Sequence, residues 1–184
     1  IISLDRTITG YMKGNYNESA DKFTRHNGSS VSGWRNFHWK SKHSAVGVTI
    51  PSEFLSKAIS NSKSPIVNDP RVHTITHVLV NASKILTKSE SSDIDAYYEN
   101  GVIYLYDNSS DGFNGCSRIV FEEFEKVLNT AFSLISDCDC PVDKNTDDKV
   151  WGGCPKCTFT TGYCQTKNKE LSKYGAKEFF ATFR

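Results

Sequence analysis

Five of the six cysteines of this chain lie between positions 138 and 164, and only Cys116 stands apart. We call these five the cysteine run; its members are Cys138, Cys140, Cys154, Cys157 and Cys164. Deprotonated cysteine is a preferred ligand of zinc, and a Cys-x-x-Cys pair on a tight turn can place two sulfurs on one tetrahedral ion. The run therefore predicts one structural Zn²⁺ site built from thiolates.

The Cys-x-x-Cys pair formed by Cys154 and Cys157 is the firmest part of this predicted site. A Gly-Gly pair before it relaxes the backbone, and a proline inside it fixes the backbone between the two ligands. Five cysteines compete for four places, and cysteines separated by a single residue rarely bind the same ion well. We therefore expect one of Cys138 and Cys140 to bind zinc together with Cys154, Cys157 and Cys164.

Three other uses of clustered cysteines are weaker. An iron–sulfur cluster also takes four thiolates, but a structural zinc is favoured. A thioredoxin-like pair would follow a strand and begin a helix, whereas Cys154 follows a polar stretch. A disulfide framework would be spread through a small secreted chain, and these cysteines are local. Four thiolates leave no open coordination position, so the predicted site is structural and not catalytic.

Two histidines and one aspartate could also carry chemistry. His73 and His77 are four residues apart in a predicted helix and could face one metal ion, but no acid lies between them as in His-Glu-x-x-His. Packing or hydrogen bonding at the helix surface is the favoured interpretation for both. Asp107 ends a predicted strand before a glycine-containing loop, where a ligand could bind. Capping the next segment or shaping a tight turn is the favoured role of Asp107.

Charge and aromatic residues give little support for nucleic-acid binding. The formal net charge is +1, and the excess of eight Lys/Arg over five acids in residues 143–184 is small. Trp34, Phe37 and Trp39 could stack on nucleobases, but packing in a core is favoured. No grouping of residues predicts an active site.

The elements that position these residues follow from hydrophobic spacing. Apolar residues at helical spacing predict helices over residues 51–59, 69–86, 116–136 and 170–183. Strands are expected over residues 7–12, 33–39, 45–50, 94–98 and 102–107. The last of these is apolar throughout, which is typical of a central strand covered on both faces. The predicted fold class is α+β, with a small mixed or antiparallel sheet packed by about four helices and a C-terminal cysteine-rich zinc-binding loop.

The 184 residues suit one domain, expected to comprise a β-rich part over residues 1–69 and a zinc-binding part over residues 70–184. The chain begins without Met, so we interpret it as a fragment of a larger protein. Neither a signal peptide nor an apolar run of the ~20 residues that cross a bilayer is visible, and the expected location is the cytoplasm.

Several motifs occur in an order that resembles a known family. The order begins with His73-x-x-x-His77, a strand over residues 103–107, a loop over residues 111–115 and a long helix. Cys138-Asp139-Cys140, Gly153-Cys154-Pro155-Lys156-Cys157, Cys164, Asn168 and residues 171–176 follow. Over residues 70–180 this pattern is similar to the MrfA-like zinc-binding domain at the C-terminus of superfamily 2 DEAD/DEAH-type helicases. The chain departs from the family pattern in the insertion of residues 141–152, where the family has a very short link.

This resemblance implies an accessory domain that binds Zn²⁺, braces a helicase motor and helps to position DNA in DNA repair or antiphage defence. Its implied partners are the motor domains of the same parent chain and single-stranded DNA, with no membrane. The parent would be an ATP-dependent DNA helicase, while the fragment lacks motor motifs and is not expected to be catalytic. One alternative is a non-catalytic, zinc-stabilised protein-interaction module of a multi-subunit complex. Another is a metal-dependent enzyme that uses His73 and His77.

Overall fold

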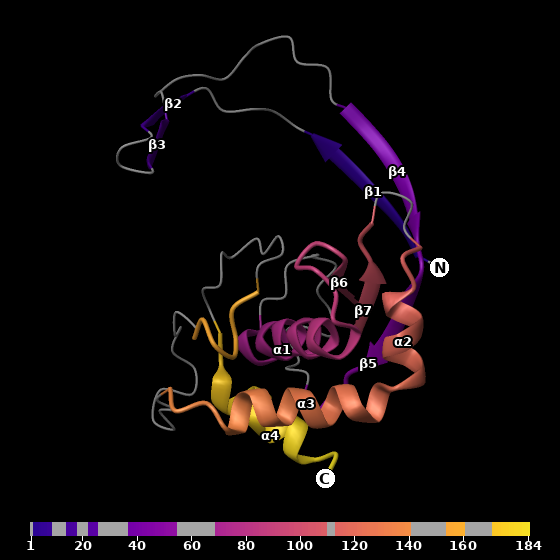
Figure 1. Ribbon diagram of the computed structural model, residues 1–184, viewed down its shortest axis with the longest axis vertical. Helices are drawn as coiled ribbons and strands as arrows, with labels where there is room; N and C mark the ends of the chain where they lie inside the picture. The colour runs from indigo at the N-terminus through magenta and orange to yellow at the C-terminus, as the bar shows by residue number, and fades with distance from the viewer. Residues whose placement is uncertain are drawn as a thin grey trace. The chain divides into compact units, whose positions relative to one another are not determined.

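The computed structural model of the chain describes residues 2–8, 14–17, 22–25, 37–54, 69–109, 113–140, 154–160 and 171–184. The chain divides into two compact units, one of residues 3–42 and one of residues 1–2 and 43–184. The larger unit contains the four helices that the structure describes (Figure 1). It also contains all of the described cysteines. It is therefore the unit that positions the candidate site.

The smaller unit contains two pairs of strands. Strand β1 (Ile2–Ile8) pairs with β4 (Phe37–His43), and β2 (Gly14–Asn17) pairs antiparallel with β3 (Lys22–Arg25). The strand expected over residues 7–12 overlaps β1 only at its end, and the strand expected over residues 33–39 overlaps the start of β4. Phe37 and Trp39 lie in β4, and Trp34 lies outside the described residues.

A three-stranded antiparallel sheet forms one side of the larger unit. Strands β5 (Ala45–Thr49), β6 (Ile94–Glu99) and β7 (Val102–Asp107) lie in the order β5-β7-β6. The predicted central position of β7 is confirmed, and Ile103 and Leu105 within it are completely buried. β5 pairs with β7 although more than fifty residues separate them, so the sheet joins the start of this unit to its middle.

The β6–β7 hairpin turns through Asn100 and Gly101. Both residues have positive φ, 51° and 83°, and Glu99 pairs with Val102 across the turn. Asn-Gly is the preferred pair for a two-residue turn that needs positive φ at both positions, because its twist matches that of the strands. This dipeptide was a sequence signal for the hairpin that the periodicity argument did not use.

Helix α1 (Pro70–Thr87) is the central helix of the larger unit. Asp69 caps its N-terminus by accepting a hydrogen bond from the backbone N–H of Arg71, and Pro70 occupies the first turn, where its missing N–H costs nothing. Lys88 ends the helix in the left-handed conformation. Residues 72–80 are all buried, because α1 contacts α2, α3, α4 and β6. A helix covered on most sides in this way is a core element.

The single helix expected over residues 116–136 is wrong: the structure has two helices, α2 (Cys116–Glu122) and α3 (Phe124–Ser136). They meet at Glu123, whose φ and ψ of −115° and 28° are not helical. Helix α2 contacts β5 and β7 in addition to α1, whereas the main partners of α3 are α1 and α4. The break lets each helix follow its own partner, which hydrophobic spacing along one chain segment cannot reveal.

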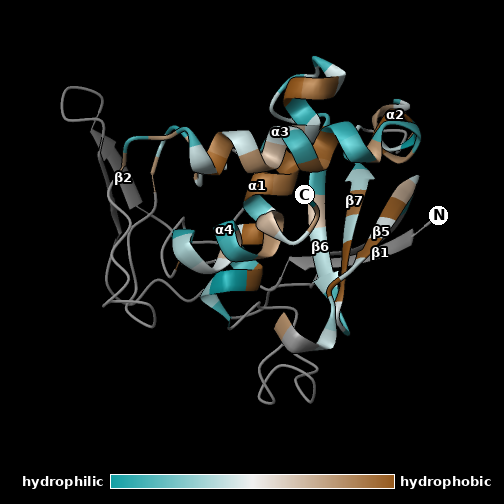
Figure 2. Ribbon diagram, turned by 90° about the horizontal axis from the view of Figure 1, so that it is seen from below, coloured by the Kyte–Doolittle hydropathy of each residue, from teal (hydrophilic) through white to brown (hydrophobic). Residues whose placement is uncertain are grey.

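Helix α4 (Lys173–Ala181) completes the larger unit, and a short 3-10 helix, η2 (Ser52–Phe54), begins where the helix over residues 51–59 was expected. Residues 55–59 of that prediction lie outside the described residues. Hydrophilic and hydrophobic residues alternate along α3, whose apolar side faces the core (Figure 2). Among the fully buried core residues are Ile75, Leu79, Leu105, Ile135 and Phe179. None of the helices described here is both long and apolar enough to cross a membrane.

The α+β class is confirmed: the described residues form a small three-stranded antiparallel sheet, four α-helices and a cysteine cluster in the C-terminal region.

Candidate metal centre

Four members of the cysteine run meet at one point of the larger unit. The Sγ atoms of Cys138, Cys140, Cys154 and Cys157 all lie within 4.8 Å of one another. The Sγ atoms of Cys138 and Cys154 are 3.6 Å apart, and those of Cys140 and Cys157 are 3.7 Å apart. Four sulfurs at 2.3 Å from a tetrahedral zinc ion would be about 3.8 Å apart. The cluster therefore has the donor atoms and the size of a tetrathiolate metal site.

Two short segments supply these sulfurs in pairs. Cys138 and Cys140 follow directly after the end of α3 at Ser136, and Cys154 and Cys157 lie on a tight turn. The expected choice between Cys138 and Cys140 is not made by the structure, because both of their sulfurs belong to the cluster. Cys164 lies outside the described residues.

Hydrogen bonds within the chain hold the Cys154–Cys157 turn in shape. The carbonyl oxygen of Cys154 accepts from the backbone N–H groups of Cys157, Thr158 and Phe159, at 3.3, 2.9 and 3.0 Å. The N–H of Cys154 in turn donates to the Thr158 hydroxyl at 2.6 Å. Cys154 is 6% exposed and Cys157 is completely buried, so this turn presents its sulfurs inward. The turn keeps this half of the site in place.

The thiols of the cluster differ in their tendency to ionise. Burial raises the pKa of Cys154, but backbone N–H groups of Lys156 and Cys157 and the neighbouring thiols outweigh it and bring the pKa down to about 7. Burial raises the pKa of Cys157, and the thiols of Cys140 and Cys138 raise it further. Burial also raises the pKa of Cys140, against the opposing effect of Lys173. A cation placed among the sulfurs would favour the thiolate form of all of them.

Lys173 is a charged neighbour of the cluster that the sequence argument missed. It is the first residue of α4 and is only 4% exposed. Its ammonium donates to the carbonyl oxygens of Cys138 and Cys140, at 2.8 and 3.3 Å, and to the Sγ of Cys140 at 3.0 Å. Lys173 belongs to the 171–176 segment of the family pattern, but neither that pattern nor its place near a predicted helix start signals contact with the cysteines.

Helix α1 holds the Cys154–Cys157 turn from its other side. His77 Nδ1 lies 2.9 Å from the carbonyl oxygen of Thr158, and the Asn81 amide donates to the carbonyl oxygen of Phe159 at 2.6 Å. A carbonyl oxygen can only accept, so His77 carries its proton on Nδ1 in this contact. The two side chains are one helical turn apart on α1 and therefore reach two successive carbonyls. The favoured role of His77 in hydrogen bonding is confirmed.

The two histidines of α1 do not form a second metal site in the described part of the chain. The rings of His73 and His77 stack edge to face with centroids 4.3 Å apart. The four-cysteine cluster is the group of three or more potential ligands found among the described residues, and neither histidine belongs to it. Both histidines are buried in the larger unit.

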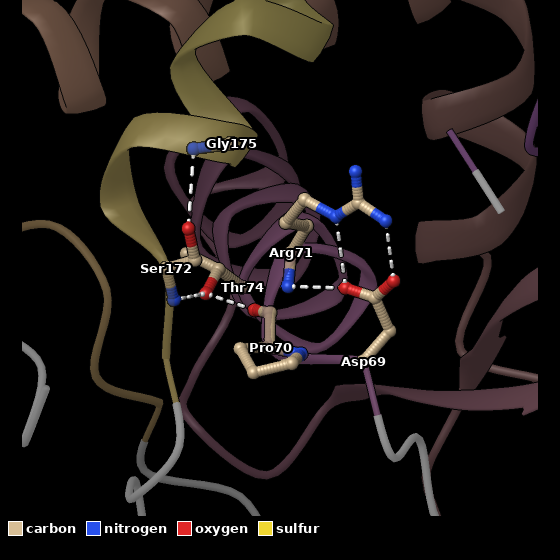
Figure 3. Close-up of polar contacts among 6 residues, drawn as sticks. All are labelled: Asp69, Pro70, Arg71, Thr74, Ser172 and Gly175. Carbon is tan, nitrogen blue, oxygen red and sulfur yellow. Dashed lines mark hydrogen bonds and ion pairs between the residues drawn. The ribbon is translucent and has the colours of Figure 1, made fainter. Parts of the chain in front are cut away.

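The start of α4, which carries Lys173, is docked on the start of α1 (Figure 3). The Ser172 N–H lies 2.7 Å from the Thr74 hydroxyl and 3.2 Å from the Pro70 carbonyl, and the Ser172 hydroxyl caps α4 by accepting from the Gly175 N–H. Arg71 lies alongside and forms a two-pronged ion pair with Asp69. These contacts hold the backbone at the start of α4, and so they set the direction from which the Lys173 side chain approaches the cysteines.

Asp107 is part of the fold and not of the cluster. Its carboxylate accepts from the backbone N–H groups of Gly115 and Ser117, at 2.9 and 2.6 Å, and is fully buried. It therefore caps α2, and the favoured capping role is confirmed. Cys116, in the first turn of α2, is likewise outside the cluster, and all five described cysteines are free thiols.

A closed set of four thiolates can hold a metal ion as a structural element. All four positions of a tetrahedral ion are then taken by protein ligands, so no open position is left for a substrate or an activated water. The arrangement can therefore stabilise a fold, by tying the end of α3 to the Cys154–Cys157 turn.

Comparison with known proteins supports this assignment. The profile of the family described as MrfA Zn-binding domain matches residues 75–158, from α1 to the end of the cysteine turn. An uncharacterized protein of Methanocaldococcus jannaschii is 31% identical over 115 residues, which cover 57% of this chain and 92% of that protein. No solved structure matches the chain. With the four clustered cysteines in place, the chain belongs to the MrfA Zn-binding domain family.

Proposed function

We propose that the chain is a zinc-binding accessory domain of a DNA helicase, in which a Zn²⁺ ion on Cys138, Cys140, Cys154 and Cys157 maintains the shape that the motor uses. The observation that carries the zinc part is the gathering of four sulfurs with two separations of 3.6 and 3.7 Å. These separations suit zinc at its usual Zn–S distance of about 2.3 Å. The family match supports the same ion.

The ligand set within this proposal consists of the four sulfurs that meet, and Cys164 is left without a place on the ion. Cysteine substitutions test the set directly. Purified chain should contain about one zinc per molecule, as a single tetrahedral site requires. Cys140→Ser and Cys157→Ser should lose most of the metal, whereas Cys164→Ser should keep it. The matched control is Cys116→Ser, because Cys116 is a cysteine outside the cluster.

Suppose that Cys140→Ser keeps its zinc and Cys164→Ser loses it. The fourth ligand would then be Cys164 and not Cys140. Full retention by every single variant would contradict the four-thiolate site altogether.

Removal of the metal tests its structural role. Binding of an ion to the folded state alone stabilises that state by about 4 kcal/mol when the free ion exceeds its dissociation constant a thousandfold. At about 2–4 °C per kcal/mol for a chain of this size, a strong chelator should lower Tm by roughly 8–16 °C. Return of zinc should restore the original Tm. A thermal unfolding curve that is the same with and without chelator would contradict a structural role.

The helicase context rests on the order of motifs that resembles the zinc-binding domain of superfamily 2 helicases. In that setting the domain braces the motor and positions single-stranded DNA, in DNA repair or antiphage defence. The motor domains of the parent chain are its direct partners, and the chain itself supplies no ATP-hydrolysing chemistry. The gene that encodes the chain provides the simplest test, because motor motifs upstream of Ile1 would be required.

A titration with labelled single-stranded DNA separates this function from the runner-up, a zinc-stabilised protein-interaction module. Anisotropy should rise at low salt and the affinity should fall as salt increases, because phosphate contacts release counterions. The Cys157→Ser variant, which should lack zinc, is the control: if DNA binding depends on the shape that the metal maintains, this variant should bind more weakly. Absence of binding even at low salt would remove the direct DNA role and favour the interaction module.

A further inference from the structure

Lys173 places a buried positive charge beside the proposed zinc ligands. Its ammonium forms three hydrogen bonds, to the carbonyl oxygens of Cys138 and Cys140 and to the Cys140 sulfur. A buried ammonium is costly unless it finds both acceptors and a negative partner. In the part of the chain that the structure describes, no carboxylate forms an ion pair with it. Once zinc is bound, the Cys140 thiolate would therefore be its counter-ion.

The charge of the site explains why a cation is useful there. A Zn²⁺ ion with four thiolates carries a net charge of two minus, since four negative sulfurs exceed the charge of the ion. A cation 3.0 Å from one of these sulfurs offsets part of that excess. The two carbonyl contacts also hold the segment of residues 138–140 in the conformation that brings both of its sulfurs to the cluster.

The position of Lys173 in the fold connects the site to a helix. Ser172, just before it, is hydrogen-bonded to Pro70 and Thr74 of α1, and Phe179 and Phe180 of α4 are buried in the core. The side chain of Lys173 thus reaches the cysteines from an anchored backbone. The profile match ends at residue 158, so Lys173 lies C-terminal to the matched residues while Cys138 and Cys140 lie within them.

We propose that Lys173 is a positioning residue of the metal centre, which holds the 138–140 segment, offsets the charge on Cys140 and joins helix α4 to the metal. The proposal rests on the zinc site put forward above. It assigns to α4 a role in metal retention, and to the metal a role in keeping the start of α4 in place. Such outer partners of metal ligands commonly change metal affinity about 10–100-fold.

The decisive variant is Lys173→Met, which keeps a long flexible side chain and removes the charge. Lys173→Arg keeps the charge, and Lys177→Met makes the same change one turn further along α4. In competition with a chromogenic chelator, Lys173→Met in the full chain should hold zinc about 10–100-fold more weakly than the wild type. Lys173→Arg should recover most of this loss, and Lys177→Met should match the wild type.

Substitution of cobalt for zinc gives an absorption spectrum that reports on the metal ligands and that a general loss of stability would not shift. A cation that hydrogen-bonds a thiolate lowers the energy of the sulfur electrons, so its removal should shift the thiolate-to-cobalt charge-transfer band to longer wavelength. The band should move in Lys173→Met and stay in place in Lys173→Arg and Lys177→Met. Amide exchange of residues 173–181 should slow on addition of zinc in the wild type and respond less in Lys173→Met.

Each result decides between the two proposals. If the wild-type chain itself binds no zinc, the proposed function fails. If the wild type binds zinc but Lys173→Met shows the affinity and cobalt band of Lys177→Met, the role of Lys173 alone is overturned. If Lys173→Met does not fold, Lys173→Arg decides: an affinity within about threefold of wild type supports the charge role, and a loss of 10-fold or more contradicts it.

Discussion

The Nδ1 atom of His77 lies 2.9 Å from the carbonyl oxygen of Thr158, a residue 81 positions further along the chain. The contact ties the middle of the central helix to the turn that carries Cys154 and Cys157. Asn81 makes the equivalent contact with Phe159 one helical turn later. The cysteine turn is thus held by its own hydrogen bonds, by α1 and, through the other cysteine pair, by α3 and α4.

Removal of the His77 contact should destabilise the chain. His77→Phe keeps an aromatic ring but leaves the buried Thr158 carbonyl without this donor, which should lower the free energy of unfolding by about 1–3 kcal/mol. Urea unfolding of the zinc-loaded chain measures the change. Ile85→Gln is the control, because Ile85 is an exposed position of the same helix, and it should stay within about 0.5 kcal/mol of the wild type. Equal effects of the two substitutions would contradict the anchoring role of His77.

The cap that Asp107 provides for α2 should also be measurable. Asp107→Ala leaves the Gly115 and Ser117 N–H groups without their acceptor and should cost about 1–3 kcal/mol. Asp107→Asn retains one acceptor oxygen and should cost less. Glu122→Gln, which removes an exposed ion pair with Arg118, should cost under about 1 kcal/mol. An Asp107→Ala variant as stable as Glu122→Gln would show that the cap is dispensable.

Because α4 is docked on α1, we expect the effect of a substitution at Gly175 on stability to depend on the side chain at position 71. A Cβ atom at position 175 would lie 2.3 Å from Cγ and 2.7 Å from Cδ of Arg71, so the arginine would have to move away from Asp69 (Figure 3). We expect Gly175→Ala to destabilise the chain by about 1–3 kcal/mol despite the better helix propensity of alanine.

The same substitution should cost less once the arginine side chain is shortened. In an Arg71→Ala background the two closest contacts are gone and only the Cβ atom of residue 71 remains, at 3.1 Å, so the better helix propensity of alanine, about 1 kcal/mol, should offset most of the cost of Gly175→Ala. A double-mutant cycle from urea unfolding gives the interaction between the two positions. Additive effects of the two substitutions would contradict the close packing of Gly175 on Arg71.

Metal binding should release protons near neutral pH. The pKa of Cys154 is lowered to about 7, so this thiol is about half ionised there, whereas the raised pKa values of Cys140 and Cys157 keep those thiols protonated. Only thiolates bind the ion, so these three thiols alone should release roughly two to three protons per zinc ion at pH 7.

The sign of the pH dependence follows from the same shifts. As pH falls through 7, Cys154 takes up its proton and the ion must displace one more, so zinc affinity should fall steeply; as pH rises, it should increase. Calorimetry in two buffers of different ionisation enthalpy counts the protons. A heat that is independent of the buffer would mean that the thiols are already ionised before binding.

Hydrophobic spacing predicted the elements whose apolar pattern runs unbroken along one segment of the chain. Helix α1 and strands β5, β6 and β7 appear close to their expected positions, because a run of apolar residues at one period forms the same element in most surroundings. The break between α2 and α3 was missed, because it depends on two different packing partners. The extent of β1 was also misjudged, since strand propensity depends on the partner strand.

By itself, the sequence determined the α+β class and the identity of the thiols that could bind a metal, because residue type and short-range spacing are properties of a local segment. Only the tertiary structure decided that Cys138 and Cys140 both reach the cluster and that His77 supports it. It also decided that Lys173, 33 residues from Cys140, is the charge beside it. These relationships arise where distant segments pack, and a buried charge finds its partner through the fold and not through its neighbours in the chain.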